Sequence, residues 1–299
     1  MSPLKSLAVP ALAALAFAAG CTDGTTPPSA PVRSPNLDIT QATPSLLVDT
    51  GPGTTGASGL LASGNTFCSP QPACLATLQF LAGQFTLPDG AAVDAVQGWM
   101  RVLLFGAGTI DIHIRADDQG LPGRSIFSKR YSLGPQNTFD WVTFADYAVA
   151  LDPGTYWLSF EPAPSGGLQA AIGQGALSPL AEYAYFVDGN GRWLTFRSIG
   201  SQPALAMRVS GTAFTAAERI ERVSAIIQSI GLESGIAHGF DAKLTAAQSA
   251  LANDDRALGC SALQDLINAL SALSAKKITA ADAARIIAYV TGIRAALEC

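Results

Sequence analysis

Residues 109–115 read Thr-Ile-Asp-Ile-His-Ile-Arg and alternate strictly between apolar and polar side chains after the first position. In an extended strand, successive side chains point to opposite faces, so Ile110, Ile112 and Ile114 share one face and the polar residues share the other. This stretch therefore predicts a strand with one face in a hydrophobic core, as in the sheets of an antiparallel β-protein.

Similar short apolar runs recur between residues 45 and 212, and turn residues separate them. The runs are Leu78–Leu87, Val93–Leu104, Thr109–Arg115, Ser125–Leu133, Trp141–Leu151, Gly154–Glu161 and Ala204–Gly211. Between them, residues 117–123, 152–154 and 188–191 are rich in Asp, Gly and Pro, which favour turns. Regularly spaced short strands predict an all-β antiparallel sandwich of the jelly-roll type over 45–212.

From Ala213 the chain changes to Ala, Leu and Ile at helical spacing. Four segments each carry an apolar stripe with gaps of three and four residues: Ile220, Val223, Ile227, Ile230; Ile236, Phe240, Leu244, Ala247, Leu251; Leu263, Leu266, Ile267, Leu270, Leu273; and Ile286, Ile287, Val290, Ile293, Leu297. Thr215 with Glu218, and Thr279 with Asp282, have the spacing of a capping box at a helix N-terminus. Residues 213–299 therefore predict a small, all-α antiparallel bundle.

The first 20 residues have the features of an export signal. Lys5 precedes an apolar run from Leu7 to Ala19, which is shorter than the roughly 20 residues that span a bilayer. Residues 18–21, Ala-Ala-Gly-Cys, resemble the bacterial lipobox, which implies that Cys21 carries a diacylglycerol. An ordinary secretory signal, leaving Cys21 as a free thiol, is the alternative. Thr22 stands where Asp would retain a lipoprotein at the inner membrane, so the resemblance favours the outer membrane or cell surface.

Residues 21–44 form a tether rich in Pro, Thr and Ser, a composition that resists burial and keeps a chain extended. Only 14% of all residues are charged and the net charge is −5, which argues against nucleic-acid binding.

The five cysteines agree with export. Without Cys21, they form two local pairs, Cys68 with Cys74 and Cys260 with Cys299, and an oxidising compartment predicts a disulfide in each. Antiparallel pairing of the last two helices brings the beginning of one, at Cys260, beside the end of the other, at Cys299. A shared metal site is the alternative, but the spacings match no zinc motif.

Both regions resemble exported families. Residues 108–115, 120–123 and 154–160 follow an order similar to the β-sandwiches of surface-anchored bacterial proteins of the "choice-of-anchor" type. The helical region resembles the FIMAH domain ("found in membrane-attached hydrolases") at Gly231-Leu232, Gly235-Ile236, Leu244, Ala250-Leu251, Cys260, Leu263, Ile267-Asn268, Lys276–Thr279, Ala283 and Cys299. These resemblances imply display at the cell surface and carry over no catalytic residue.

Two kinds of ligand site have candidate residues. Trp193 follows the turn at 188–191, while Tyr183 and Tyr185 precede it, so these rings are expected to be exposed and able to stack on a sugar. Trp99 and Trp157 lie in apolar runs and are expected in the core. Asp117, Asp118 and Asp188 supply carboxylates that suit calcium, although Asp is equally expected in plain turns.

No catalytic motif is present: the chain lacks a Gly-x-Ser-x-Gly elbow, a His-Glu-x-x-His pair and a phosphate-binding glycine loop. His113 and His238 are interpreted as structural or surface residues. Acid–base chemistry needs paired groups, and the sequence selects no pair among the carboxylates Asp111, Asp117, Asp140 and Glu161.

The prediction is a lipid-anchored, non-catalytic cell-surface protein without a cofactor, acting in adhesion, scaffolding or partner docking. A carbohydrate-binding surface lipoprotein is the alternative, and a hydrolase-associated accessory module is a third interpretation. The expected partners are the membrane, through the lipid, and either a glycan or a protein of the cell envelope.

Overall fold

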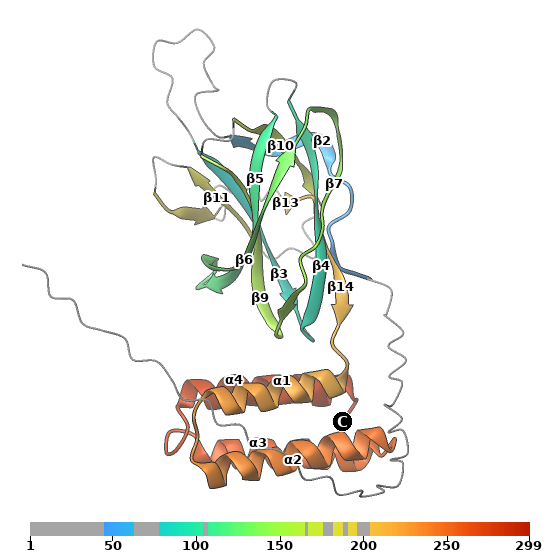
Figure 1. The fold of residues 1–299 in the computed structure, drawn as a ribbon, viewed down its shortest axis with the longest axis vertical. Coiled ribbons are helices and arrows are strands. Elements are labelled where there is room, and N and C mark those ends of the chain that lie inside the picture. Colours follow the sequence, from blue (N-terminus) through green and yellow to red (C-terminus); the bar gives the residue numbers. More distant parts are fainter. Residues whose placement is uncertain are drawn as a thin grey trace, which may run out of the picture. The chain divides into compact units, whose positions relative to one another are not determined.

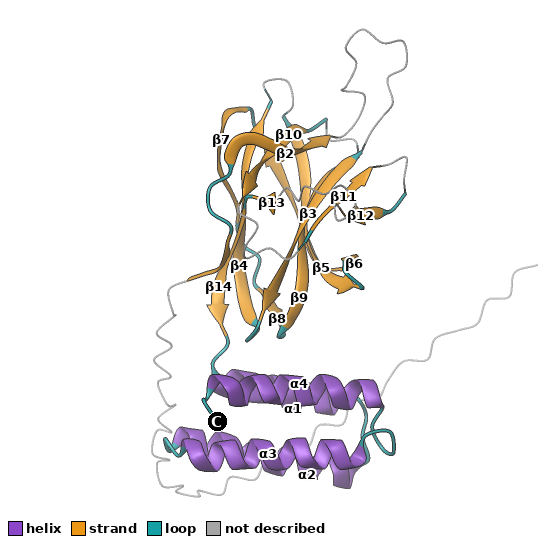
Figure 2. Cartoon of the chain, turned by 180° about the vertical axis from the view of Figure 1, so that it is seen from behind, coloured by secondary structure: helices purple, strands orange, loops and turns teal. Residues whose placement is uncertain are grey.

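A computed structural model describes residues 45–62, 78–103, 107–164, 167–175, 182–187, 191–195 and 204–299. The signal peptide 1–20 and the tether 21–44 lie outside this part of the chain, as do Cys21, Cys68, Cys74 and Asp188. Strands occupy the described residues up to Ala213, and helices follow from Ala216 (Figure 1, Figure 2). The predicted class, an antiparallel β-sandwich followed by a small all-α bundle, is confirmed.

The strands are β1 Ser45–Asp49, β2 Thr54–Ala62, β3 Gln79–Leu87, β4 Ala91–Val102, β5 Gly108–Asp118, β6 Leu121–Leu133, β7 Gln136–Phe144, β8 Val149–Leu151, β9 Gly154–Pro162, β10 Gln169–Gly175, β11 Tyr183–Val187, β12 Trp193–Thr195, β13 Ala204–Leu205 and β14 Met207–Ala213. Every pairing between these strands is antiparallel.

The strands form two layers that are joined along one edge. One layer runs β11–β3–β9–β5–β6, and the other places β14 and β1 on one side of β4 with β7 and β8 on its other side. Strands β10 and β2 connect the layers, since β10 pairs with both β4 and β2, and β2 pairs with β3. The chain crosses between layers after β3, β4, β6 and β8, which gives the connectivity its jelly-roll character.

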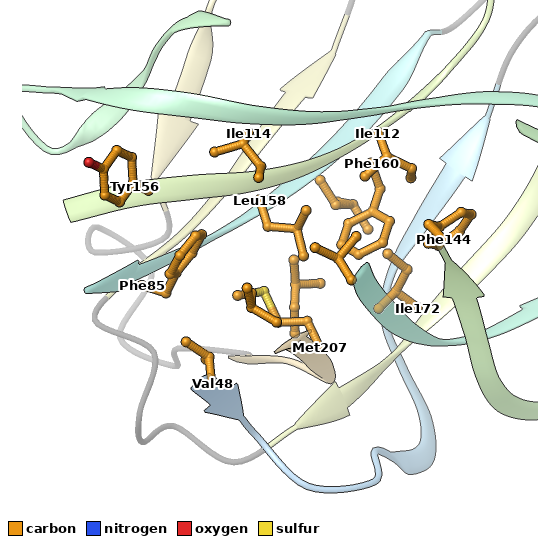
Figure 3. Close-up of a cluster of buried hydrophobic side chains, with 14 of the residues drawn as sticks. Val48, Phe85, Ile112, Ile114, Phe144, Tyr156, Leu158, Phe160, Ile172 and Met207 are labelled. Carbon is orange, nitrogen blue, oxygen red and sulfur yellow. The ribbon is translucent and has the colours of Figure 1, made fainter. Parts of the chain in front are cut away.

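The sandwich core lies between the layers, where the alternating apolar residues of facing strands meet (Figure 3). The three isoleucines of residues 109–115 are fully buried and pack with Phe85, Phe144 and Phe160. Gly98 leaves room for Phe160, because a Cβ at that position would lie 2.9 Å from the phenylalanine Cε1. The alternation at 109–115 therefore predicts the inward face of β5 correctly.

The run Trp141–Leu151, predicted as one strand, is wrong in its boundaries. The structure divides it into the end of β7 and the separate β8, because Asp146 and Ala148 adopt left-handed backbone angles, with φ of 60° and 44°. Between them, Tyr147 is 2% exposed and its N–H donates to the carbonyl oxygen of Asp94. Burial of one ring thus bends a run that the sequence presents as continuous.

The helices are α1 Ala216–Ser229, α2 Ser234–Ala252, α3 Arg256–Leu273 and α4 Ala280–Ala296. Each packs against two others, α1 and α3 both contacting α2 and α4. Their buried residues form a core separate from that of the sandwich. Most of these residues come from the predicted stripes, which omit Ala262, Ile278, Ala283 and Tyr289. Thr215 and Thr279 cap α1 and α4, and the reciprocal capping box between Thr215 and Glu218 is complete.

A disulfide joins Cys260 near the beginning of α3 to Cys299, which follows α4, with a Cα–Cα distance of 5.8 Å. The predicted pairing of these two cysteines is confirmed. Within the part of the chain that the structure describes, no helix combines the length and the apolar character needed to cross a bilayer.

Candidate functional site

The outer face of the layer β3–β9–β5 carries polar side chains with an unusual degree of burial. The polar half of the alternation in β5 points away from the core, and register pairs Asp111 with Glu161 and His113 with Ser159. Glu161 is 8% exposed and Ser159 is fully buried, although both lie on this outer face. We call the set Asp111, His113, Arg115, Ser159 and Glu161 the polar face.

Strand β12 folds back over this layer and accounts for the burial. It pairs with β11, which pairs with β3, and it also contacts β6 on the opposite edge of the layer. Its first residue, Trp193, packs on a small cluster of Ala82, Trp157 and Ala184. Trp157, predicted in a core, is fully buried, but in this second cluster beneath β12.

Trp193 is half-buried and borders the polar face. The guanidinium carbon of Arg115 lies 5.9 Å from its ring centroid. Phe80 and Phe186 stack on each other at 5.0 Å, and both lie near the indole, at 6.3 and 5.9 Å. Phe80, Phe186 and Trp193 thus form an aromatic cluster beside Arg115 of the polar face.

Arg115 and Glu161 form the centre of the polar face. Arg115 Nε and Nη2 donate to Glu161 Oε1 and Oε2 at 2.8 and 2.9 Å, which is the bidentate geometry that fixes both groups in orientation. Ser159 also donates to Glu161, and Arg115 Nη1 donates to the carbonyl oxygen of Gly123. The two charges are thus paired, and these hydrogen bonds fix the orientation of both side chains.

The remaining side chains form a row along β5. His113 Nε2 lies 3.5 Å from Glu161 Oε2, and its Nδ1 lies 3.0 Å from the hydroxyl oxygen of Ser125. Asp111 accepts two hydrogen bonds of 2.7 Å from Arg130, whose side chain is 63% exposed. Burial lowers the pKa of His113, an effect that the Glu161 carboxylate opposes and the Arg115 cation reinforces.

The predicted ring residues are distributed differently from the expectation. Tyr183 is 3% exposed and Tyr185 is half-buried, and both point from β11 into the sandwich core. Alternation explains this placement, because Ala184 and Phe186 take the outward positions. The expected exposure of Tyr183 is therefore corrected, and of the three predicted rings only Trp193 borders the polar face.

Asp117, predicted as a calcium ligand, has a different set of partners. Its Oδ1 accepts from Trp157 Nε1 at 2.8 Å and from Gln84 Nε2 at 2.7 Å, and its Oδ2 accepts from the N–H of Gly120. These donors explain its position at the β5–β6 turn without a cation. Asp118 is exposed. Across the described residues, no group of three or more potential metal ligands occurs.

Trp99, predicted in the core, instead lies half-buried on the outer face of the other layer. It pairs in register with Trp141 across β4 and β7, and their rings meet edge-on with centroids 5.5 Å apart. Gly53 makes room for it, because a Cβ there would lie 2.6 Å from Trp99 Cδ1. The predicted burial of Trp99 is wrong because side chains alternate along β4. Val96, Met100 and Val102 take the inward positions, so Trp99 points outward.

No protein-family model matches the chain, and no curated protein does. Among solved structures, the cysteine protease and lectin-like domains of Cwp84, a surface layer associated protein of Clostridium difficile, are similar to 45% of this chain and are covered over 32% of their length, with 11% identity and a TM-score of 0.32. The CBM51-2 and INT domains of Clostridium perfringens ZmpB, in complex with GlcNAc, match with a coverage of 77% and 43%, 9% identity and a TM-score of 0.20.

A family two carbohydrate esterase from Cellvibrio japonicus is similar over 54% of this chain and 36% of its own, with 13% identity and a TM-score of 0.19. The chain thus spans less than half the length of each of these three proteins. Similarity at these TM-scores identifies neither a ligand nor an activity for this chain.

Proposed function

We propose that this chain is a non-catalytic saccharide-binding lipoprotein of the cell surface. The observation that carries the proposal is the half-buried Trp193 ring standing beside a row of oriented polar side chains on one sheet face. Binding sites for small polar ligands combine aromatic surface with a few precisely placed polar groups. Saccharides suit this combination, because a sugar ring has an apolar face and a rim of hydroxyl groups.

Each part of the polar face has a role in this proposal. Trp193 provides the flat apolar surface on which a sugar ring stacks. Asp111 and His113, held by Arg130 and Ser125, present oriented acceptors and donors to hydroxyl groups. Arg115 and Glu161 occupy each other and keep the face rigid, so little side-chain entropy is lost when a ligand binds.

The same pairing favours binding over catalysis. A catalytic carboxyl group must contact the reacting atoms of its substrate, whereas both oxygens of Glu161 already accept hydrogen bonds from Arg115. Asp111 is held in the same way by Arg130. Both carboxylates are thus best used as fixed hydrogen-bond acceptors.

The binding proposal predicts the effect of Trp193→Ala. Affinity of the full chain for the saccharide that it retains on a glycan array should fall about tenfold or more, because the main stacking surface is lost. Trp193→Phe, which keeps an aromatic ring over the Trp157 cluster, should retain part of the affinity. Leu46→Ala, an exposed apolar residue of the other layer, is the matched control.

Tryptophan fluorescence should show that each variant is folded before affinities are compared. If the wild-type chain retains no glycan on the array, the binding proposal is wrong, and docking to an envelope protein becomes the better hypothesis.

The anchor part of the proposal rests on residues 18–21 and predicts the effect of Cys21→Ser. This variant should lose labelling by an alkyne fatty acid and leave the membrane fraction, because the thiol that accepts the diacylglycerol is gone. Cys68→Ser, another cysteine outside the helical region, is the control and should still be labelled. Unchanged labelling of Cys21→Ser would contradict the anchor proposal, whereas a wild-type chain without any labelling would support an ordinary secretory signal.

A further inference from the structure

The outer face of the layer that contains β4 carries a set of aromatic and arginine side chains, none of which belongs to the polar face. Strands β4, β7 and β14 contribute Trp99, Arg101, Phe139, Trp141 and Arg208, all of them half-buried. We call this set the arginine–aromatic face. It stands on adjacent strands of one layer, since β4 pairs with both β7 and β14.

The two guanidinium groups lie directly on the rings. Arg208 Cζ is 3.9 Å from the centroid of Trp141, and Arg101 Cζ is 5.3 Å from that of Phe139. Arg208 reaches Trp141 across β4, because its register partner on β4 is Gln97. These cation–π contacts hold the arginine heads close to the sheet and spread flat beside aromatic surface.

The positive charge of this face is only partly neutralised. Arg208 donates to Asp49 at 2.9 Å, and this hydrogen bond lowers the pKa of the Asp49 carboxyl group. The side chain of Arg101, in contrast, makes no hydrogen bond or ion pair with any residue in the described ranges, and its buried Nε has no acceptor there. Asp140 on β7 accepts from the backbone N–H of Trp141.

We propose that the arginine–aromatic face is a second binding site, whose ligand is a carboxylated saccharide of the uronic-acid class. Arg101 would pair with the carboxylate, for which the guanidinium fork has matching geometry. Trp141 and Phe139, which are both half-buried, would contact the apolar side of the sugar ring. This site is independent of Trp193 and the polar face, which lie on the other layer.

Charge complementarity favours this occupant over the alternatives. A neutral glycan would leave the half-buried Arg101 guanidinium without an anionic partner, and an unpaired buried donor is energetically unfavourable. Nucleic acid needs several cations along its backbone, and this face offers two in a chain of net charge −5. A polymer with one carboxylate per sugar can place a carboxylate at Arg101 beside the half-buried rings.

The experiment compares polygalacturonate with its methyl-esterified form, which has the same sugar ring without the charge. The full chain should bind polygalacturonate at least tenfold more tightly than the ester, and binding should weaken when salt shortens the Debye length from about 8 Å to about 3 Å. Arg101→Gln should reduce the affinity for polygalacturonate about tenfold, whereas Arg101→Lys, which keeps the charge, should lose less. Arg124→Gln, an exposed arginine on β6, is the matched control.

Three results would overturn the inference: equal binding of the two polymers, unchanged affinity of Arg101→Gln, or tighter binding of oligo(dT) than of polygalacturonate. If Trp193→Ala abolishes polygalacturonate binding while Arg101→Gln does not affect it, the saccharide lies on the polar face. In that case the proposed function stands and the second site is rejected. The reverse pattern would support the arginine–aromatic face, and the polar face would still be judged by the effect of Trp193→Ala on the glycan array.

Discussion

The helical region and the sandwich differ in the sequence separation of the residues that stabilise each of them. In the helices, caps such as Thr215 to Glu218 and Thr279 to Asp282 join residues three apart. In the sandwich, Thr50 donates to the carbonyl oxygen of Leu205 across 155 positions, and Ser45 donates to that of Gly211 across 166. The first and last strands of the sandwich are therefore neighbours only because the fold brings the two ends of the region together.

This difference determines where each region is vulnerable. The helices form from local signals, but their core is small, and a small core needs an additional covalent or packing constraint. The sandwich has a larger core, which is built by strands that are distant in sequence. We therefore expect it to be most sensitive to changes where the backbones of two paired strands approach closely. Changes confined to one region should therefore be detectable by separate signals.

The disulfide provides the strongest test of this comparison. Cys260 and Cys299 are 39 positions apart, so the bridge should stabilise the helical region by about 4 kcal/mol in the loop-entropy account. The double variant Cys260→Ser/Cys299→Ser should therefore lower the melting temperature of the helices by roughly 20 °C. All four tryptophans lie between residues 99 and 193, so fluorescence follows the sandwich while circular dichroism at 222 nm follows the helices.

In this experiment the fluorescence transition should hardly move. A fall of both transitions by the same amount would show that the two regions unfold as one unit. That result would contradict the separation of their cores as an account of stability.

A glycine in the last strand tests the sandwich in the same way. A Cβ at Gly211 would lie 2.1 Å from the carbonyl oxygen of Ala92, a backbone contact that no side-chain rotation relieves. Gly211→Ala should destabilise the sandwich by about 1–3 kcal/mol, as measured by tryptophan fluorescence in urea. Gly134→Ala, where a Cβ would meet nothing within 4 Å, is the matched control and should change little.

The helical signal should be unaffected by Gly211→Ala. If this variant is as stable as the control, the backbones of β14 and β4 are not packed as closely as the structure shows.

Local patterns predict most of the fold. The helical stripes and the two threonine caps are visible in the sequence, because helix formation depends on neighbours three and four positions apart. Alternation likewise identifies the inward face of β5. The course of residues 141–151 is not predictable in this way, because it depends on Tyr147 entering a core that distant strands build.

The candidate site is even less predictable from local patterns, because its residues come from strands that are distant in sequence. Alternation places Asp111, His113 and Arg115 on one face of β5, but it cannot identify which strand lies next to them. Glu161 is 46 positions from Arg115 and becomes its partner only through the pairing of β5 with β9. Arg101 and Arg208 are missed for the same reason, since only pairing with β4 brings their rings and charges together.

The smallest predicted effect concerns the imidazole of His113 and the dependence of sandwich stability on pH. Burial holds the pKa of His113 below its usual value of 6.5, so the folded sandwich binds that proton less readily than the unfolded chain. The stability that the neutral ring preserves is therefore complete above pH 6.5 and is lost as the pH falls through the window below it. His113→Gln, which keeps a neutral polar group near Ser125, should remove this part of the pH dependence. His238→Gln, at an exposed position of α2, is the matched control and should leave the tryptophan-monitored transition unchanged.

The measurement is urea unfolding followed by tryptophan fluorescence at pH 7.5 and pH 5. Between these values the wild-type chain should lose more stability than His113→Gln does. If it instead loses less, the attraction of Glu161 for the protonated ring outweighs burial, and the polar face would gain a stabilising cation on acidification rather than a cost.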